Sequence, residues 1–325
     1  METRQIITLG EEVLAGYKIT RPEALRLSCI EDADIPLLSA YANKIRLKYA
    51  GNHVDMCGII NARSGRCSED CKFCAQSVFH AADSPTYPLL SKNELLKQAK
   101  NIEKQGAKRV SLVTSGKGMQ GDSDFESILA IFKEIISSTT LKVCANLGTL
   151  DLGQAQRLAA TGIRRYAHNL ETSKSYYPTI CTSHPYDERL ETILAAKQAG
   201  LELCCGGIVG MGESWDDRIE LALALRELGV QSIPINILNP LKGTALENIK
   251  PPRPLEILKI FAIFRFILPD RVIRPAGGRE LNLRDMQGAL MLGGANGLII
   301  GNYLTFSGRN SDIDFQMVHD AGLNQ

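Results

Sequence analysis

The sequence has no long apolar run, no excess of one charge and few aromatic side chains. Aromatic residues make up 6% of the 325 positions, and 37 Lys and Arg balance 36 Asp and Glu. This balance argues against a nucleic-acid-binding surface or a charged membrane-binding patch. No apolar stretch reaches the ~18 residues of a spanning helix, and the N-terminal METRQIITLGEE lacks the layout of an export signal. We therefore expect a cytoplasmic protein with neither nucleic-acid nor membrane partners.

Cysteine, in contrast, is frequent. The chain contains nine, an odd number in a long sequence without an export signal. A disulfide framework is not expected in such a protein, and metal or cluster binding fits better. An isolated cysteine such as Cys29 is more simply explained as a small buried hydrophobe.

Short runs rich in Val and Ile alternate with longer amphipathic stretches, after a helical lead-in over residues 22–50. Strands that alternate with helices indicate a parallel sheet, and eight of them match a closed (β/α)8 TIM-type barrel. A doubly wound open sheet is the alternative. We predict an N-terminal helical extension at 1–50, the barrel at 51–304, and a C-terminal tail at 305–325 that caps the barrel mouth. The predicted strands begin near Val54, Arg109, Leu141, Ile163, Leu201, Ser232, Arg271 and Gly297.

Three cysteines stand close together just after the first predicted strand. Cys67, Cys71 and Cys74 form a C-x3-C-x2-C run, and thiolates this close converge on one metal centre. Thiolates suit zinc or an iron–sulfur cluster. A structural zinc site would need a fourth Cys or His nearby, but the next histidine is His80 and no C-x2-C follows. Three ligands leave one iron of a four-iron cluster open, as a reactive cluster requires; zinc and an inert electron-transfer cluster are the alternatives.

This run, with Phe73 before its last cysteine, is similar to the signature of the radical S-adenosylmethionine (SAM) superfamily. Further segments between about residues 54 and 305 resemble the biotin synthase family: NARSGRCSEDCKFCAQS, CANLGTL, YAHNLETS, CGGIVGMGE, SIPINILNPLKGT and GANGLIIGNYLT. The resemblance implies that Cys67, Cys71 and Cys74 hold a [4Fe–4S] cluster to which SAM binds. It also implies that Phe73 lies near the adenine of SAM.

The same resemblance assigns roles around the cofactor and the substrate. Glu171 corresponds to an acidic residue that binds the ribose hydroxyls, for which a carboxylate acceptor is suited. A glycine-rich loop with Gly207, Gly210 and Glu213 is implied to support SAM, because glycines let backbone approach a ligand closely. Without the family, this loop is an ordinary turn, and each asparagine named next is a capping or turn residue. Substrate or cofactor binding is implied for Asn169, Asn236 and Thr305.

Biotin synthases also carry an auxiliary iron–sulfur cluster, held by three cysteines on different strands and one arginine. Cys144 and Arg274 match two of these positions. Cys204 matches a third, and Cys205 directly after it is an additional candidate. Neighbouring strand residues face opposite sides, so without a bulge only one of this pair can point inward.

The remaining auxiliary position departs from the family. This chain has Ser111 where relatives have a cysteine, and Cys57 on the adjacent first strand is the candidate replacement. The altered set leaves the cluster open between [2Fe–2S] and [4Fe–4S], with a preference for the second. The alternative is that Cys57 and Cys205 are packed core thiols.

The activity that the resemblance implies is radical sulfur insertion. The first cluster would reduce SAM to methionine and a 5′-deoxyadenosyl radical, the radical would abstract hydrogen from dethiobiotin, and sulfur from the auxiliary cluster would close the ring of biotin. A flavodoxin or ferredoxin is the implied electron donor, and a homodimer the implied assembly. Two alternatives are a radical SAM enzyme without sulfur insertion, of the hydrogenase-maturation or amino-acid mutase type, and a non-catalytic iron–sulfur carrier.

Overall fold

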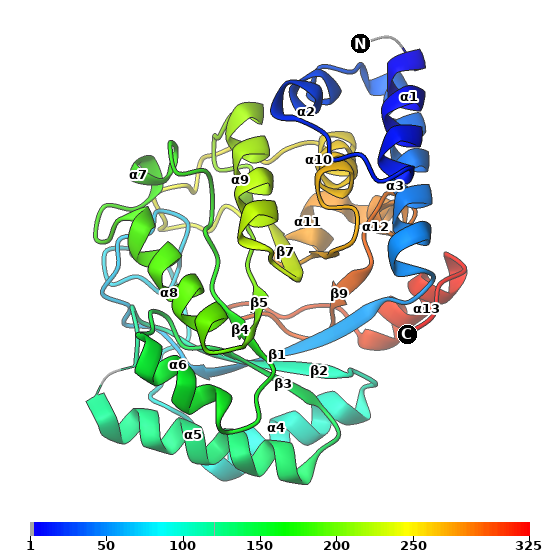
Figure 1. Cartoon of the computed structure of the whole chain (residues 1–325). Helices are drawn as coiled ribbons and strands as arrows, with labels where there is room; N and C mark the ends of the chain where they lie inside the picture. Colours follow the sequence, from blue (N-terminus) through cyan, green and yellow to red (C-terminus); the bar gives the residue numbers. More distant parts are fainter. Residues whose placement is uncertain (1–2, 120) are drawn as a thin grey trace.

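The computed structural model describes residues 3–119 and 121–325, and its strands form a parallel barrel surrounded by helices (Figure 1). All eight predicted strands are present, the fifth of them as two short strands, so the predicted (β/α)8 fold is confirmed. The strands are β1 (Asp55–Arg63), β2 (Arg109–Thr114), β3 (Lys142–Asn146), β4 (Arg165–Ala167), β5 (Glu202–Cys204), β6 (Gly207–Val209), β7 (Ser232–Ile237), β8 (Val272–Pro275) and β9 (Gly297–Ile299).

The sheet closes on itself. The strand order is β6-β7-β5-β4-β3-β2-β1-β9, and β8 also pairs with β7. Asn296 joins β8 to β9, because its backbone N–H donates to the Ile273 carbonyl at 3.0 Å. Its side-chain oxygen also accepts from the Ile273 N–H at 2.9 Å. The two ends of the sheet therefore meet, and the open-sheet alternative is excluded.

The fifth predicted strand is split in two. β5 ends at Cys204 and β6 begins at Gly207, because the chain between them passes very close to β7. A Cβ atom on Gly206 would lie 1.8 Å from the carbonyl oxygen of Pro234. β6 then pairs with the carboxyl-terminal half of β7. The break begins at the second of two neighbouring cysteines, Cys204 and Cys205.

The helices begin where the sequence supplies capping residues. Ser91, Asp151 and Ser214 each exchange hydrogen bonds with the residue three positions on, which satisfies free N–H groups of the first turn. None of the helices in the described parts of the chain is both long and apolar enough to cross a membrane. The helices are α1 (Thr3–Leu14), α2 (Arg21–Ser28), α3 (Ile35–Ala50), α4 (Lys92–Lys104), α5 (Gly121–Ser138), α6 (Leu152–Ala159), α7 (Tyr177–Ile180), α8 (Tyr186–Gln198), α9 (Trp215–Leu228), α10 (Pro254–Ile267), α11 (Arg279–Leu283), α12 (Gln287–Met291) and α13 (Ser311–Asp320).

The N-terminal helices pack on one side of the barrel. Helices α1 and α3 lie against each other, and α3 and α2 contact α10, which is buried along nearly its whole length (Figure 1). Cys29 directly follows α2 and is exposed, so the prediction that it is a buried thiol is wrong. The residues on either side, Ser28 and Ile30, are buried, whereas the side chain of Cys29 faces solvent. The division of the chain at residues 50 and 304 stays a prediction.

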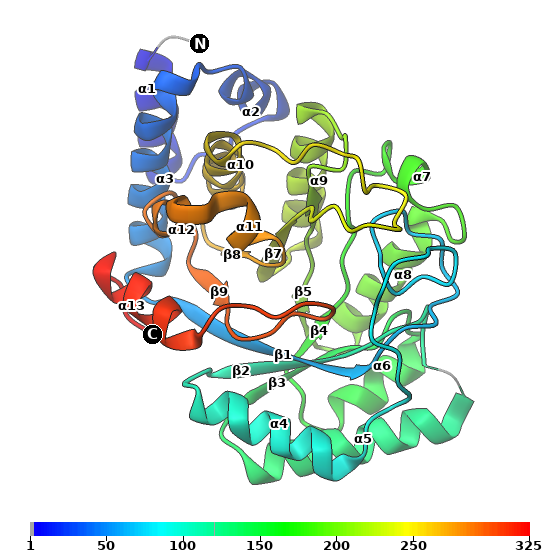
Figure 2. The same ribbon diagram turned by 180° about the vertical axis from the view of Figure 1, so that it is seen from behind.

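The segment after β9 extends across the barrel and then turns back into α13 (Figure 2). Asp314 of α13 is completely buried and pairs with Arg279 at 2.7 Å and with Arg309 at 2.6 Å. Beyond α13, the Asn324 carbonyl accepts from the Val54 N–H at 2.8 Å, just before β1. The tail therefore runs from the mouth of the barrel to its opposite end, and only its first residues lie at the mouth.

Candidate active site

A cavity of about 330 Å³ opens at the carboxyl ends of the strands, where the active sites of (β/α)8 barrels lie. Polar side chains line it at three strand ends: Asn146 of β3, His168 after β4 and Asn236 of β7. The cysteine-rich loop after β1 and residues 304–306 after β9 form other parts of its wall. Segments from distant parts of the chain thus meet around one space.

The three cysteines of the loop after β1 all line this cavity. Gln76 holds the loop to the end of β1, because its side-chain oxygen accepts from the Gly65 N–H at 3.0 Å and the Ser64 hydroxyl at 3.1 Å. The Cys74 N–H donates to the Cys71 carbonyl at 2.9 Å. Burial raises the pKa of Cys74 to about 11, so a metal that binds here must displace a proton.

Phe73, Glu171 and Thr305 also line the cavity. Glu171 has a left-handed backbone conformation with φ of 69°, which is uncommon for a residue other than glycine. Its carboxylate lies 3.7 Å from the guanidinium of Arg189. Burial raises the pKa of Glu171, although Arg189 opposes this shift. Strained backbone with a buried carboxylate is typical of a ligand-binding position.

The two predicted asparagines face the same cavity. Asn169 Oδ1 accepts from the Gly206 N–H at 3.1 Å, and Asn236 Oδ1 accepts from the Gly277 N–H at 3.0 Å. Their amide nitrogens make only long contacts, each 3.4 Å. The oxygen of each amide therefore supports the backbone, while the nitrogen is available to a bound molecule.

A second group of thiols faces the barrel interior. In the register of the strands, Cys57 of β1 lies opposite Arg109 of β2. Ser111, two residues further along β2, lies opposite Cys144 of β3. Because paired residues and alternate residues of parallel strands share a face, Cys57 and Cys144 face the same side. Burial raises the pKa of Cys57 to about 12, and the nearby thiols of Cys144 and Cys204 add to the rise. Cysteines from three different strands therefore lie near one another.

Three arginines surround these thiols: Arg274, Arg109 and Arg165 are between 2% and 6% exposed. Asp55 lies 2.9 Å from Arg274 and 3.7 Å from Arg109. Burial alone would raise the pKa of Asp55, but the three arginines outweigh it and lower this pKa to about 2. One nitrogen of each arginine is nevertheless buried without a hydrogen-bond partner. Since free buried donors are costly, the surroundings of the thiols fit an additional anionic group.

Known proteins match the chain along nearly its whole length. Residues 62–225 match the radical SAM superfamily, and residues 234–324 match the Biotin and Thiamin Synthesis associated domain. The biotin synthase of Clostridium acetobutylicum is 54% identical over 98% of this chain and 97% of its own length, and that of Carboxydothermus hydrogenoformans is 52% identical over 98% of each. The chain belongs to the biotin synthase family.

Solved structures share the fold of this biotin synthase family member at lower sequence identity. A methylornithine synthase has a TM-score of 0.84 at 21% identity and covers 97% of this chain and 96% of its own. HydG, a maturase of the [FeFe]-hydrogenase, has a TM-score of 0.84 at 17% identity and covers 99% and 75%. At these identities the likeness shows the fold alone, so the distinction among radical SAM enzymes rests on the full-length sequence relatives.

Membership of the biotin synthase family implies a [4Fe–4S] cluster, SAM and an auxiliary iron–sulfur cluster. The residues present fit both clusters. The loop thiols line the cavity, and the interior thiols are surrounded by arginine nitrogens that lack partners. Ser111 shares the interior face, but a neutral hydroxyl is a poor ligand for iron. The individual ligands stay a prediction.

Cys204 and Cys205 lie in different surroundings. Cys204 Sγ lies 3.6 Å from the Ser232 hydroxyl, and both residues are paired across β5 and β7. Cys205 is 1% exposed within the main apolar core, and it lies near Tyr186 of α8. The break after β5 does not turn both thiols inward. This placement favours the packed-thiol alternative for Cys205 and leaves Cys204 with the interior group.

The glycine-rich loop supports the cavity from behind. A Cβ atom on Gly207 would lie 2.3 Å from the carbonyl oxygen of Glu171, so only glycine allows this approach. Gly210 donates its N–H to Glu213 at 2.8 Å, and Glu213 also pairs with Arg218 at 2.6 Å. Within the described parts of the chain, none of the three predicted loop residues lines the cavity. Their contact with the cofactor stays a prediction.

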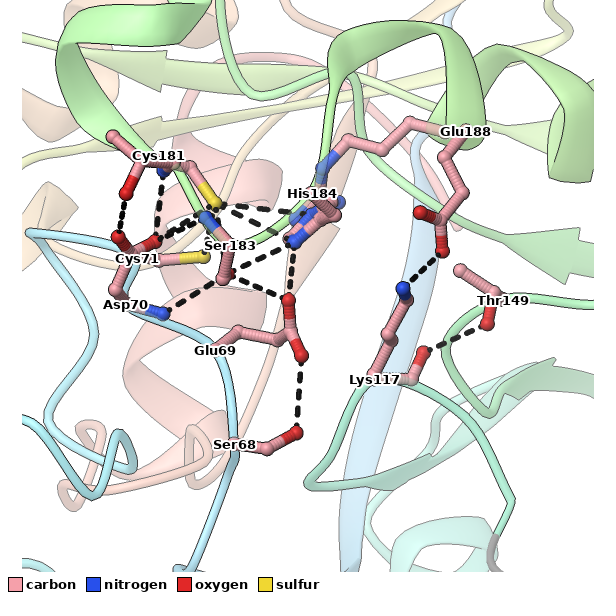
Figure 3. Close-up of polar contacts among 12 residues, drawn as sticks. Ser68, Glu69, Asp70, Cys71, Lys117, Thr149, Cys181, Ser183, His184 and Glu188 are labelled. Carbon is pink, nitrogen blue, oxygen red and sulfur yellow. Dashed lines mark hydrogen bonds and ion pairs between the residues drawn. The ribbon is translucent and has the colours of Figure 1, made fainter.

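Several polar residues of the cavity were not predicted from the sequence. The Nε2 atom of His168 is buried without a partner, and burial holds the pKa of His168 well below its usual range. Asn146, Lys117 and Arg189 also line the cavity, and Lys117 reaches Glu188 at 2.8 Å (Figure 3). The available signal was position, since Asn146 and His168 stand at or just after the ends of predicted strands.

Cys181 and His184 were also missed. We expected no fourth Cys or His ligand near the cluster loop, and this holds for neighbours in sequence but not for neighbours in space. In the fold, Cys181 Sγ lies 3.7 Å from Cys71 Sγ, although the two residues are 110 positions apart (Figure 3). The signal was the C-x2-H spacing of Cys181 and His184, which is short enough for two ligands of one metal.

Proposed function

We propose that this protein is a biotin synthase that inserts sulfur into dethiobiotin in a SAM-dependent radical reaction. The observation that carries the proposal is the presence of two separate groups of three cysteines, one at the cavity wall and one in the barrel interior. When bound, the first cluster supplies the electron that cleaves SAM to methionine and a 5′-deoxyadenosyl radical, and the auxiliary cluster supplies sulfur. A radical SAM enzyme without sulfur insertion is not expected to carry Cys144, Cys204 and Arg274 together.

The chain offers a distinct set of ligands for each cluster. A guanidinium has no free lone pair at its normal pKa, so chemistry alone does not favour Arg274 as an iron ligand. Its assignment therefore rests on the family resemblance. A buried guanidinium held by Asp55 and retaining one free N–H supports an anion-binding role beside the thiols. We assign Cys67, Cys71 and Cys74 to the [4Fe–4S] cluster, and Cys57, Cys144, Cys204 and Arg274 to the auxiliary cluster, preferably [4Fe–4S] rather than [2Fe–2S].

The remaining side chains bind and orient. Glu171 accepts hydrogen bonds from the ribose of SAM, and Arg189 orients the Glu171 carboxylate from 3.7 Å away. Asn169 and Asn236 present their amide nitrogens to substrate or cofactor. The closed barrel keeps water from the reacting atoms. Phe73 and Thr305 complete the wall around adenine and substrate.

The electron donor is a flavodoxin or ferredoxin, and the functional assembly is a homodimer. Both statements rest on the family resemblance. Titration of the oxidised enzyme with each reduced donor and measurement of the mass in solution address them separately.

The proposed activity has a direct test. After anaerobic reconstitution with iron and sulfide, the enzyme should convert SAM and dethiobiotin to 5′-deoxyadenosine and biotin under reducing conditions. A radical SAM enzyme without sulfur insertion would form 5′-deoxyadenosine but no biotin. A non-catalytic iron–sulfur carrier would form neither product.

Asn236 allows the binding role to be separated from the backbone role. Asn236→Ala removes the whole amide, whereas Asn236→Asp keeps an oxygen for the Gly277 N–H and removes the amide donor. Because loss of a buried partner costs about 1–3 kcal/mol, we expect both variants, and Asn169→Ala, to weaken ligand binding roughly five- to a hundred-fold. Equilibrium binding of SAM and dethiobiotin is the measurement, with the exposed Asn101→Ala as control. Normal affinity in Asn236→Asp would leave this residue with backbone support alone.

A further inference from the structure

Cys71, Cys181 and His184 form a compact set of metal-ligand side chains at the edge of the cavity (Figure 3). All three are buried, and one ligand atom from each lies within 4.8 Å of the others. The two Sγ atoms are 3.7 Å apart, and Cys181 Sγ is 3.4 Å from His184 Nδ1. Ordinary zinc bond lengths in a tetrahedron place two sulfurs about 3.8 Å apart, and sulfur and imidazole nitrogen about 3.6 Å apart.

We propose that these three side chains bind a single divalent transition-metal ion in the protein that has not yet received its cluster. Two thiolates and one imidazole are ligands of the kind that zinc and related ions select. Binding releases two protons to solvent, one from the Cys71 thiol and one from the hydrogen-bonded pair of Cys181 and His184, and leaves the oxidation state of every atom unchanged. This site uses one cysteine of the cluster loop together with two residues that the proposed function leaves without a task.

The two distant segments are held together by contacts that do not involve the metal ligands. Asp70 accepts from the Thr182 N–H at 2.9 Å and from the Ser183 N–H at 3.0 Å. The Asp70 N–H in turn donates to the Ser183 hydroxyl at 3.2 Å. Residues 181–184 are therefore fixed against the cluster loop in advance, which lowers the entropy lost when an ion binds.

The surroundings of His184 also fit a metal ligand. Its Nε2 atom lies 2.7 Å from the Tyr177 hydroxyl, which in turn accepts from Arg189 Nε at 2.7 Å. Metal-binding histidines usually use their second ring nitrogen in such a hydrogen bond, and this orients the first nitrogen toward the metal. Glu69 contacts Nδ1 at 2.5 Å, so its carboxylate is near enough to provide a fourth, oxygen ligand once Nδ1 coordinates the ion.

The sharing of Cys71 has a functional consequence, which rests on the proposed role of Cys71 as a ligand of the [4Fe–4S] cluster. One thiolate cannot serve both a separate ion and the cluster in the loop. Occupation by the ion and occupation by the cluster therefore exclude each other. A bound zinc-type ion would delay cluster assembly until it is removed.

Cobalt provides a direct probe, because Co²⁺ bound by thiolates absorbs in the near-ultraviolet and visible range. The cluster-free full-length protein should take up about one Co²⁺ at this site with such absorption. Cys181→Ala and His184→Gln should weaken this binding by more than about a hundredfold, since even loss of an outer hydrogen bond to a ligand costs ten- to a hundred-fold. Cys74→Ala is the matched control: it removes a cluster ligand and should leave Co²⁺ binding unchanged.

The outcomes are separable from those of the proposed function. Equal Co²⁺ affinity in the wild type and Cys181→Ala, or its loss in Cys74→Ala, would overturn the site. Normal iron–sulfur reconstitution of Cys181→Ala reports that the variant folds. Zinc added first should slow reconstitution of the wild type and not of Cys181→Ala; equal slowing in both would overturn the exclusion. Failure of the wild type to form a cluster would contradict the proposed function while leaving the Co²⁺ comparison readable.

Discussion

Cys71→Ala is expected to reduce SAM cleavage to background. Three thiolates hold the cluster in the proposed assignment, and two cannot retain it with one iron open for SAM. The fold should survive, because Cys71 lies in a loop at the cavity wall and its contact with Cys181 contributes about 1 kcal/mol at most. The measurement is 5′-deoxyadenosine formed per chain under reducing conditions, together with iron content and the circular dichroism spectrum.

Cys29→Ala is the matched control for this experiment, because Cys29 is exposed and distant from both thiol groups in the sequence. It should keep the wild-type rate and iron content. A Cys71→Ala enzyme that formed 5′-deoxyadenosine at the wild-type rate would refute the assignment of the loop to the radical cluster.

Cys57→Ala should stop biotin formation while leaving some SAM cleavage. Cys57 is the proposed replacement for the cysteine that relatives have at the position of Ser111, and Ser111 cannot substitute well at iron. Loss of Cys57 should therefore release the auxiliary cluster and retain the cluster of the loop. Iron and sulfide per chain, measured beside biotin and 5′-deoxyadenosine, distinguish the two clusters.

Neighbouring cysteines supply the controls. Cys204→Ala should behave like Cys57→Ala, because the Cys204 thiol lies near Cys57 in the same interior group. Cys205→Ala should keep its iron and still form biotin, because this thiol packs in the core near Tyr186. A Cys57→Ala enzyme with full iron content and normal biotin formation would make Cys57 a packing residue. The remaining ligand position would then fall to Ser111 or to a group from outside the protein.

Much of the fold, and the proposed site of the first cluster, could be predicted from local sequence patterns. The eight strands follow from Val- and Ile-rich runs between amphipathic stretches, a signal that each segment contains by itself. The proposed ligands Cys67, Cys71 and Cys74 are neighbours in sequence, so their assignment needs no structure. Asn169, Asn236 and Glu171 depended on the family resemblance, and the structure adds that both amide oxygens support the backbone.

What escaped prediction depends on contacts between distant segments. The break between β5 and β6 arises from the approach of the Pro234 carbonyl on another strand. The Gly206–Gly207 pair permits this approach, but residues 201–210 do not reveal which segment makes it. The nitrogens without partners around the interior thiols follow from how Arg274 and Arg109 share Asp55 while Arg165 pairs with Glu202. Cys181 and His184 become neighbours of Cys71 through contacts between distant segments, among them the hydrogen bonds that Asp70 accepts and the Lys72 N–H donates.

The way the barrel closes sets an order of events during synthesis. β1, which carries Cys57, pairs on one side with β2 but on the other with β9, and the Ile300 N–H donates to the Cys57 carbonyl at 2.9 Å. Such long-range pairings form late, because the chain between them must first be made and its loop-closure entropy lost. A growing chain thus exposes one edge of β1 to other proteins until residues near 300 have emerged. In the proposed assignment of ligands, the loop that ends at Cys74 is synthesised long before Arg274, the last ligand of the auxiliary cluster.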